Sequence, residues 1–175
     1  MDKTAYFNDL MARTEELFYH ELSDCAAWKT EFIGVDFIRS KNIEGGSTGA
    51  IIENCIKEII AAGLIKGASY SIGGEEILLY VKVQRCIHLP KEVKLKAGGI
   101  QPYNCPIINM VLDQLIEKLN FATTYVANLE IDEVGGECTI KCAIFQTADK
   151  IGNVCDWSDE CRLIEENNQW KTVSC

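Results

Sequence analysis

Apolar side chains recur at helical spacing in three segments of the chain, residues 5–23, 47–63 and 104–120. In the second segment, isoleucine and cysteine side chains lie three or four positions apart and form a wide apolar stripe, and the third repeats the pattern with isoleucine, valine and leucine. Ser47 or Thr48 can cap the second segment, Asn104 or Cys105 can cap the third, and Pro106 suits the first turn of the third. We therefore expect three helices. The apolar positions of the first are Phe7, Leu10, Met11, Leu17, Phe18 and Leu22.

A strand-like pattern follows each of the last two helices. Residues 68–86 hold two β-rich runs around "GGEE", and residues 123–145 hold two such runs around Gly135 and Gly136. Two copies of a helix-plus-hairpin plan predict an α+β fold, in which a central antiparallel sheet is covered by helices mainly on one face. Residues 24–46 fit either a short strand or a helix, and residues 161–174 resemble two short strands.

The length of 175 residues suits a single domain. Within it we distinguish an N-terminal helical segment (1–46), a core (47–145) and a C-terminal extension (146–175). No apolar run reaches the roughly 18–20 residues that span a bilayer, and the first residues lack the pattern of a signal peptide. We expect a cytoplasmic protein without a membrane span.

The charge excludes one class of partner. The net charge is −9 and the isoelectric point about 4.8, whereas nucleic-acid binding relies on clustered lysine and arginine. The densest basic stretch, "KEVKLK" at residues 91–96, predicts a solvated loop. The sequence contains neither a G-x-S-x-G nucleophile motif nor a phosphate-binding loop of the G-x-x-x-x-G-K-[ST] type, so it identifies no catalytic residue.

Cysteine and histidine residues form the main chemical pattern. Nine cysteines are many for a chain without a secretory signal, and their odd number does not favour a disulfide framework. If the two hairpins share one sheet, five side chains can converge near one end of it. They are Cys86, His88, Cys105, Cys138 and Cys142.

Three interpretations of these five residues remain open. Thiolate and imidazole groups suit zinc or, where thiolates dominate, an iron–sulfur cluster. The alternatives are buried cysteines with an exposed loop histidine, or a redox or catalytic thiol. Strand alternation turns Cys138 and Cys142 toward the core and both Cys86 and His88 the other way. A bulge or strand end must therefore reorient Cys86 and His88. Cys105 at a helix start is expected to have a lowered thiol pKa, because it lies at the positive end of the helix dipole.

The stretches "NCPIINMVLDQLIEKL" and "LEIDEVGGECTIKCAIF" resemble the 4-vinyl reductase domain group over about residues 47–145. Members have a cysteine at a helix start and a pair of cysteines in the last strand. Glu137 fits the pattern, whereas Phe145 lies one position too far from Cys142. The resemblance implies a fold shared with trafficking-complex subunits and haem-based gas sensors, and a role in binding small molecules. It also implies that Cys105, Cys138 and Cys142 contact a metal or ligand.

The leading expectation is thus a cytoplasmic protein that binds or senses a small apolar molecule, with or without a cysteine/histidine metal site. One alternative is a thiol- or metal-dependent hydrolase or reductase that uses Cys105 or the Cys86/His88 pair. A second alternative is a scaffold subunit that binds a partner, and a homodimer is compatible with it.

Overall fold

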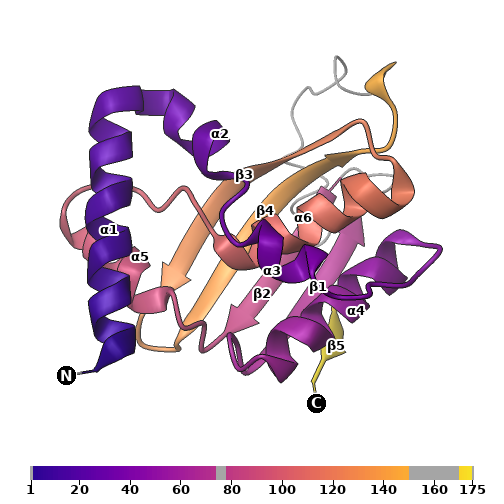
Figure 1. Ribbon diagram of the computed structural model, residues 1–175, viewed down its shortest axis with the longest axis horizontal. Coiled ribbons are helices and arrows are strands. Elements are labelled where there is room, and N and C mark those ends of the chain that lie inside the picture. The colour runs from indigo at the N-terminus through magenta and orange to yellow at the C-terminus, as the bar shows by residue number, and fades with distance from the viewer. Residues whose placement is uncertain (1, 74–77, 150–169, 175) are drawn as a thin grey trace.

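The computed structural model describes residues 2–73, 78–149 and 170–174. Twelve elements follow one another along this part of the chain (Figure 1). They are α1 (Lys3–Leu22), η1 (Ser23–Cys25), α2 (Ala26–Thr30), α3 (Val35–Arg39), α4 (Thr48–Ala61), β1 (Gly67–Gly73), β2 (Leu78–Gln84), α5 (Leu89–Ala97), α6 (Pro106–Leu119), β3 (Thr123–Asp132), β4 (Glu137–Phe145) and β5 (Lys171–Val173).

The five strands form one antiparallel sheet in the order β3-β4-β2-β1-β5. The two predicted hairpins, β1–β2 and β3–β4, share this sheet because β2 pairs with β4. The predicted α+β fold is therefore confirmed. A fifth strand, β5, extends the sheet beyond β1. The turn around "GGEE" and most of the C-terminal extension lie outside the described residues.

Helices α4 and α6 cover one face of the sheet, as their apolar stripes predict (Figure 1). In α4, Ile52, Ile56 and Ile59 are buried, and Ser47 Oγ accepts a hydrogen bond from the Ala50 N–H at the start of the helix. Apolar side chains of β2 and β4 complete this core. On the opposite face, Tyr80 packs edge-on against Trp170. The hydrophobic stripes alone thus place the two central helices correctly.

The remaining helices lie beside this core. Residues 24–46 form no strand; they fold into the short helices α2 and α3, which precede α4. The connection between the hairpins holds a further helix, α5, against which α1 packs at one side of the molecule (Figure 1). None of the described helices is both long and apolar enough to cross a membrane.

Candidate functional site

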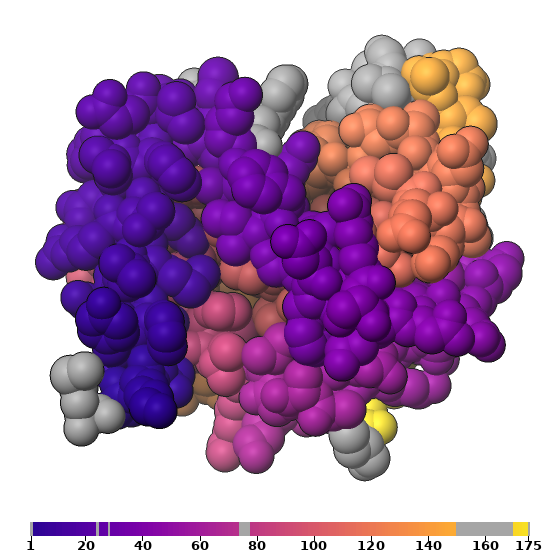
Figure 2. All heavy atoms as spheres, in the orientation of Figure 1, coloured from indigo at the N-terminus to yellow at the C-terminus, as the bar shows by residue number. Residues whose placement is uncertain are grey.

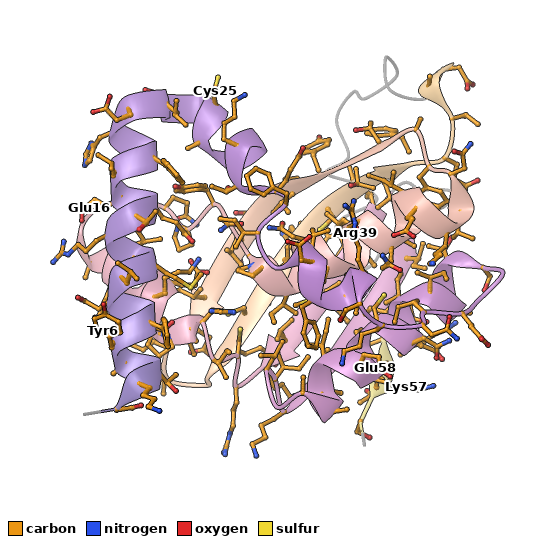
Figure 3. All side chains as sticks on the ribbon, in the orientation of Figure 1. Tyr6, Glu16, Cys25, Arg39, Lys57 and Glu58 are labelled. Atoms are coloured by element: carbon orange, nitrogen blue, oxygen red, sulfur yellow. The ribbon has the colours of Figure 1, made fainter. Side chains whose placement is uncertain are left out.

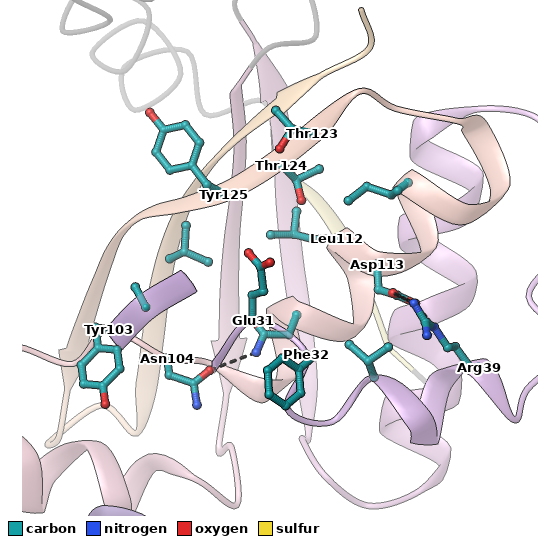
Figure 4. Close-up of a pocket in the computed structure, with 15 residues that line it drawn as sticks. Glu31, Phe32, Arg39, Tyr103, Asn104, Leu112, Asp113, Thr123, Thr124 and Tyr125 are labelled. Atoms are coloured by element: carbon teal, nitrogen blue, oxygen red, sulfur yellow. Dashed lines mark hydrogen bonds and ion pairs between the residues drawn. The ribbon is translucent and has the colours of Figure 1, made fainter. Parts of the chain in front are cut away.

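A pocket of about 280 Å³ opens between the α2–α3 segment, α6 and β3 (Figure 4). This volume is slightly below the usual range for ligand pockets, about 300–1,000 Å³. Its aromatic and aliphatic lining comes from segments far apart in the sequence: Ala27, Phe32, Val35, Leu112, Ile116, Tyr125 and Val126. Phe32 leaves 67% of its surface exposed. Polar and charged side chains, among them Glu31, make up nearly half of the lining, so the pocket suits a small molecule that has both apolar and polar groups.

Polar groups surround the apolar lining at defined places. At one side, Arg39 donates two hydrogen bonds to the Asp113 carboxylate, from Nε to Oδ2 at 3.1 Å and from Nη2 to Oδ1 (Figure 4). This ion pair joins α3 to α6. At another side, Thr123 and Thr124 contribute hydroxyl groups from the start of β3. The pocket therefore offers hydrogen-bonding groups at its rim as well as apolar contacts.

Two buried asparagines form the inner wall of the pocket. Asn109 Nδ2 donates to Asn104 Oδ1 at 2.9 Å (Figure 4). It also donates to the Thr30 carbonyl at 3.0 Å. Asn104 Nδ2 donates in turn to Glu15 Oε1 at 3.0 Å. Because buried polar groups are stable only when paired, these bonds hold the start of α6 against both α2 and α1.

Behind Asn104 lies a buried ion cluster of Glu15, Lys91 and Glu92. Lys91 Nζ lies 2.9 Å from both Glu15 carboxylate oxygens, 2.7 Å from Glu92 Oε1 and 2.8 Å from the Asn104 carbonyl oxygen. Lys91 has no exposed surface, and Glu15 and Glu92 each expose 2%. Desolvation of such charges is costly, so the cluster is stable only as long as all its partners are present.

The two carboxylates of the cluster are not equivalent. Burial lowers the pKa of Lys91, but its attraction to Glu92 and Glu15 outweighs burial and raises that pKa overall. Burial raises the pKa of Glu92 to about 7, against the opposing effect of Lys91. Glu92 Oε2 has no hydrogen-bond partner among the described residues. One ammonium group thus contacts two carboxylates, and the pKa of Glu92 lies near neutral pH.

The ion cluster corrects the interpretation of "KEVKLK" as a solvated loop. Residues 89–97 form helix α5, with Pro90 in its first turn, and the side chains of Lys91 and Glu92 point into the protein. Only Lys94 and Lys96 have the expected exposure. The burial of Glu15 could not be predicted either, because nothing in the sequence distinguishes it from the other glutamates of α1, which are not buried.

The four predicted thiols gather in the core. Cys138 and Cys142 lie on the core face of β4, as predicted, opposite Val83 and Leu79 of β2. Cys86 joins them because β2 ends at Gln84 and the next residue, with a φ of 49°, turns the chain inward. Burial raises the pKa values of these thiols. Repulsion between Cys105 and each of the other three adds to this effect, so Cys105 lies near them.

These thiols are protonated rather than reactive. Cys105 is the N-cap of α6, as predicted, but its predicted low pKa is wrong: burial raises it to about 12, against a small opposing effect of the Ile108 N–H. Burial likewise raises the pKa of Cys86 to about 12, although the His88 N–H donates to its Sγ. A buried neutral thiol is a poor nucleophile, so the geometry gives no support to a thiol-dependent enzyme.

His88 is partly buried at the N-cap of α5, and not exposed in a loop. Burial and the nearby Lys91 ammonium lower its pKa to about 4. Within residues 2–73, 78–149 and 170–174, no group of three or more histidine, cysteine, aspartate or glutamate side chains is placed to hold a metal ion. The four predicted cysteines lie in one core cluster and His88 contacts Cys86 through its N–H, and the metal site stays a prediction.

Comparison with family models, curated proteins and solved structures found no match. The resemblance to the 4-vinyl reductase domain group therefore stays a prediction.

Proposed function

We propose that the protein binds a small, mainly apolar molecule in the pocket between α3, α6 and β3, and acts as a ligand-binding or sensory protein. The observation that carries the proposal is the composition of the pocket: aromatic and aliphatic side chains from four segments converge there, with hydrogen-bonding groups at defined positions. The buried, protonated thiols supply core packing in this proposal and take no part in chemistry.

The inner wall supports the proposal in a second way. Asn104 and Asn109 are held by hydrogen bonds to α1 and α2, so the wall is fixed before any ligand arrives. A preorganised wall reduces the entropy that binding must offset. The pocket can therefore retain a small ligand without a rearrangement of the core.

A substitution that fills the pocket tests this function. Thr124 lines the pocket from β3, and tryptophan is well tolerated in strands. We expect Thr124→Trp to weaken binding of the neutral fluorescent probe N-phenyl-1-naphthylamine by about tenfold or more, or about 1.4 kcal/mol, because the indole occupies the ligand volume. Fluorescence titration measures this, and native mass spectrometry of the freshly purified protein checks for a retained small molecule.

The matched control is Thr139→Trp. Thr139 is also half-buried in a strand, but it lies on β4 between the core-facing Cys138 and Ile140, so it faces the other side of the sheet and does not line the pocket. Probe binding should survive this change. Equal binding by Thr124→Trp and the unaltered protein would place the ligand elsewhere and refute the proposed site.

A further inference from the structure

Helix α1 turns its apolar side away from the protein. Four large side chains on its outer face remain strongly exposed: Tyr6 by 52%, Phe7 by 58%, Leu10 by 50% and Leu17 by 56%. The helix forms the left margin of the molecule in Figure 2, and Figure 3 shows Tyr6 on the side of α1 that points away from the body. A contiguous apolar face of this kind is typical of an interaction site.

The inner face of α1 is mixed. It buries Asn8, Ala12 and Glu15, and Met11, Phe18 and Leu22 are partly buried. Asn8 Nδ2 donates to the Ile87 carbonyl at 2.9 Å, and Glu15 belongs to the ion cluster described above. In an ordinary surface helix the apolar stripe faces the core, whereas in α1 half of the predicted apolar positions, Phe7, Leu10 and Leu17, are exposed. Its attachment to the protein uses hydrogen bonds and an ion pair, which leaves the apolar stripe available for another surface.

The outer face of α1 has two rows with seven-residue spacing. Lys3, Leu10 and Leu17 form one row, and Phe7, Thr14 and Glu21 form the row beside it. The positive charge of Lys3 lies at the start of the first row, and the negative charge of Glu21 lies at the end of the second row. The two rows together make an apolar stripe that has opposite charges at its two ends.

We propose that α1 pairs with α1 of a second copy of this chain, antiparallel about a two-fold axis, so that the protein forms a homodimer. In this arrangement Lys3 meets Glu21 of the partner subunit, and Phe7 meets Leu17 of the partner subunit. Each row of one helix then faces the other row of its partner. A single pairing satisfies both charges and covers the apolar side chains of both copies.

The charges exclude the competing arrangements. A parallel pairing would bring two Lys3 side chains together at one end and two Glu21 side chains together at the other, and would align the helix dipoles. A membrane surface is also disfavoured: the chain carries a net charge of −9, and α1 lacks the lysine- and arginine-rich border of helices that bind anionic lipids. The second copy is therefore the occupant that fits.

Mass measurement over a concentration series tests the proposal. We expect sedimentation velocity and light scattering to give twice the 19.6 kDa of one chain at micromolar concentration. Leu10→Glu/Leu17→Glu should weaken the dimer by about 100-fold or more, since central apolar anchors dominate interfaces and the symmetry counts each change twice. Both side chains are half-exposed, so circular dichroism should show unchanged helix content and melting temperature at the concentrations where the variant is monomeric.

A charge exchange tests the antiparallel geometry. Lys3→Glu and Glu21→Lys should each weaken the dimer about three- to tenfold, and the double variant should recover the original affinity because it restores the opposite pairing. Lys57→Glu, an exposed lysine of α4, is the control and should leave the dimer unchanged.

Three results would overturn the proposal. They are a monomer throughout the series up to about 100 µM, a dimer that resists Leu10→Glu/Leu17→Glu, or a double charge variant no tighter than the single ones. Binding of the monomer to anionic vesicles through the same leucines would assign the face to lipid instead. The proposal does not depend on the pocket, and Thr124→Trp should leave the dimer intact.

Discussion

At the scale of single residues, Lys91 is the side chain that holds the buried ion cluster together. Its ammonium group contacts Glu15, Glu92 and the Asn104 carbonyl, all in the interior. Removing it leaves two buried carboxylates without their cation. Loss of one partner of a buried ion pair is far more costly than the loss of a surface pair.

We expect Lys91→Ala to lower the free energy of unfolding by about 3–5 kcal/mol. Urea denaturation followed by tryptophan fluorescence measures the change. Lys94→Ala is the matched control three residues along the same helix: its partner Asp9 is exposed, and stability should hardly change. Similar losses in the two variants would mean that the buried cluster contributes no more than a surface pair.

Glu92 gives the protein a specific pH dependence. Its pKa is about 7 in the folded protein and 4.5 ordinarily, so the folded state binds the proton more tightly than the unfolded state. This contribution to stability is complete below pH 4.5 and is lost as the pH rises through 7. Glutamine has no such ionisation and can still accept a hydrogen bond from Lys91.

The stability of Glu92→Gln relative to the unaltered protein should therefore increase by about 2–3 kcal/mol from pH 5 to pH 8. Urea denaturation at several pH values gives the difference, and Glu133→Gln at an exposed turn should show none. Parallel pH profiles for Glu92→Gln and the unaltered protein would mean that Glu92 is already ionised throughout this range.

At the scale of elements, the end of β2 decides where Cys86 lies. Arg85 has a φ of 49°, in the left-handed region, and its N–H donates to the Gly136 carbonyl at 2.7 Å. This turn directs the chain from the sheet surface into the core. A residue with a β-carbon adopts this conformation only at a cost.

Arg85→Gly should raise the free energy of unfolding by about 0.5–1 kcal/mol, because relief of the left-handed conformation outweighs the greater freedom of glycine in the unfolded chain. Gln84→Gly, one residue earlier in the strand, should lower it by a similar amount. Thermal denaturation compares the two. Destabilisation by both changes would show that Arg85 contributes through its side chain.

The sequence predicted elements whose signal is local. The stripes of α4 and α6, their capping residues, the second hairpin and the core face of Cys138 and Cys142 all depend on neighbours within a few positions. The burial of Lys91 depends on partners 13 and 76 residues away, so the local sequence "KEVKLK" is equally compatible with an exposed loop. The position of Cys105 at a helix start was predicted correctly. Its thiol pKa was not, because complete burial raises this pKa more than the helix end can lower it.

At the scale of the whole molecule, Asn104 connects regions that lie far apart in the sequence. Asn104 touches the pocket, the ion cluster and, through Glu15, the helix that we propose as the dimer contact. The pocket itself could not be predicted, because its walls come from α2, α3, α6 and β3, and only the packing of these elements creates the space. The amphipathic pattern of α1 was evident in the sequence, but not which face would be buried.

The arrangement of α1 also sets an order in time during synthesis. Glu15 leaves the ribosome 76 residues before Lys91 and 89 before Asn104. At about 5–20 residues per second, α1 waits about 4–18 s before its inner face can be paired. During that interval both faces of the helix lack their partners, so α1 stays unprotected until the segment with Lys91 and Asn104 has been made.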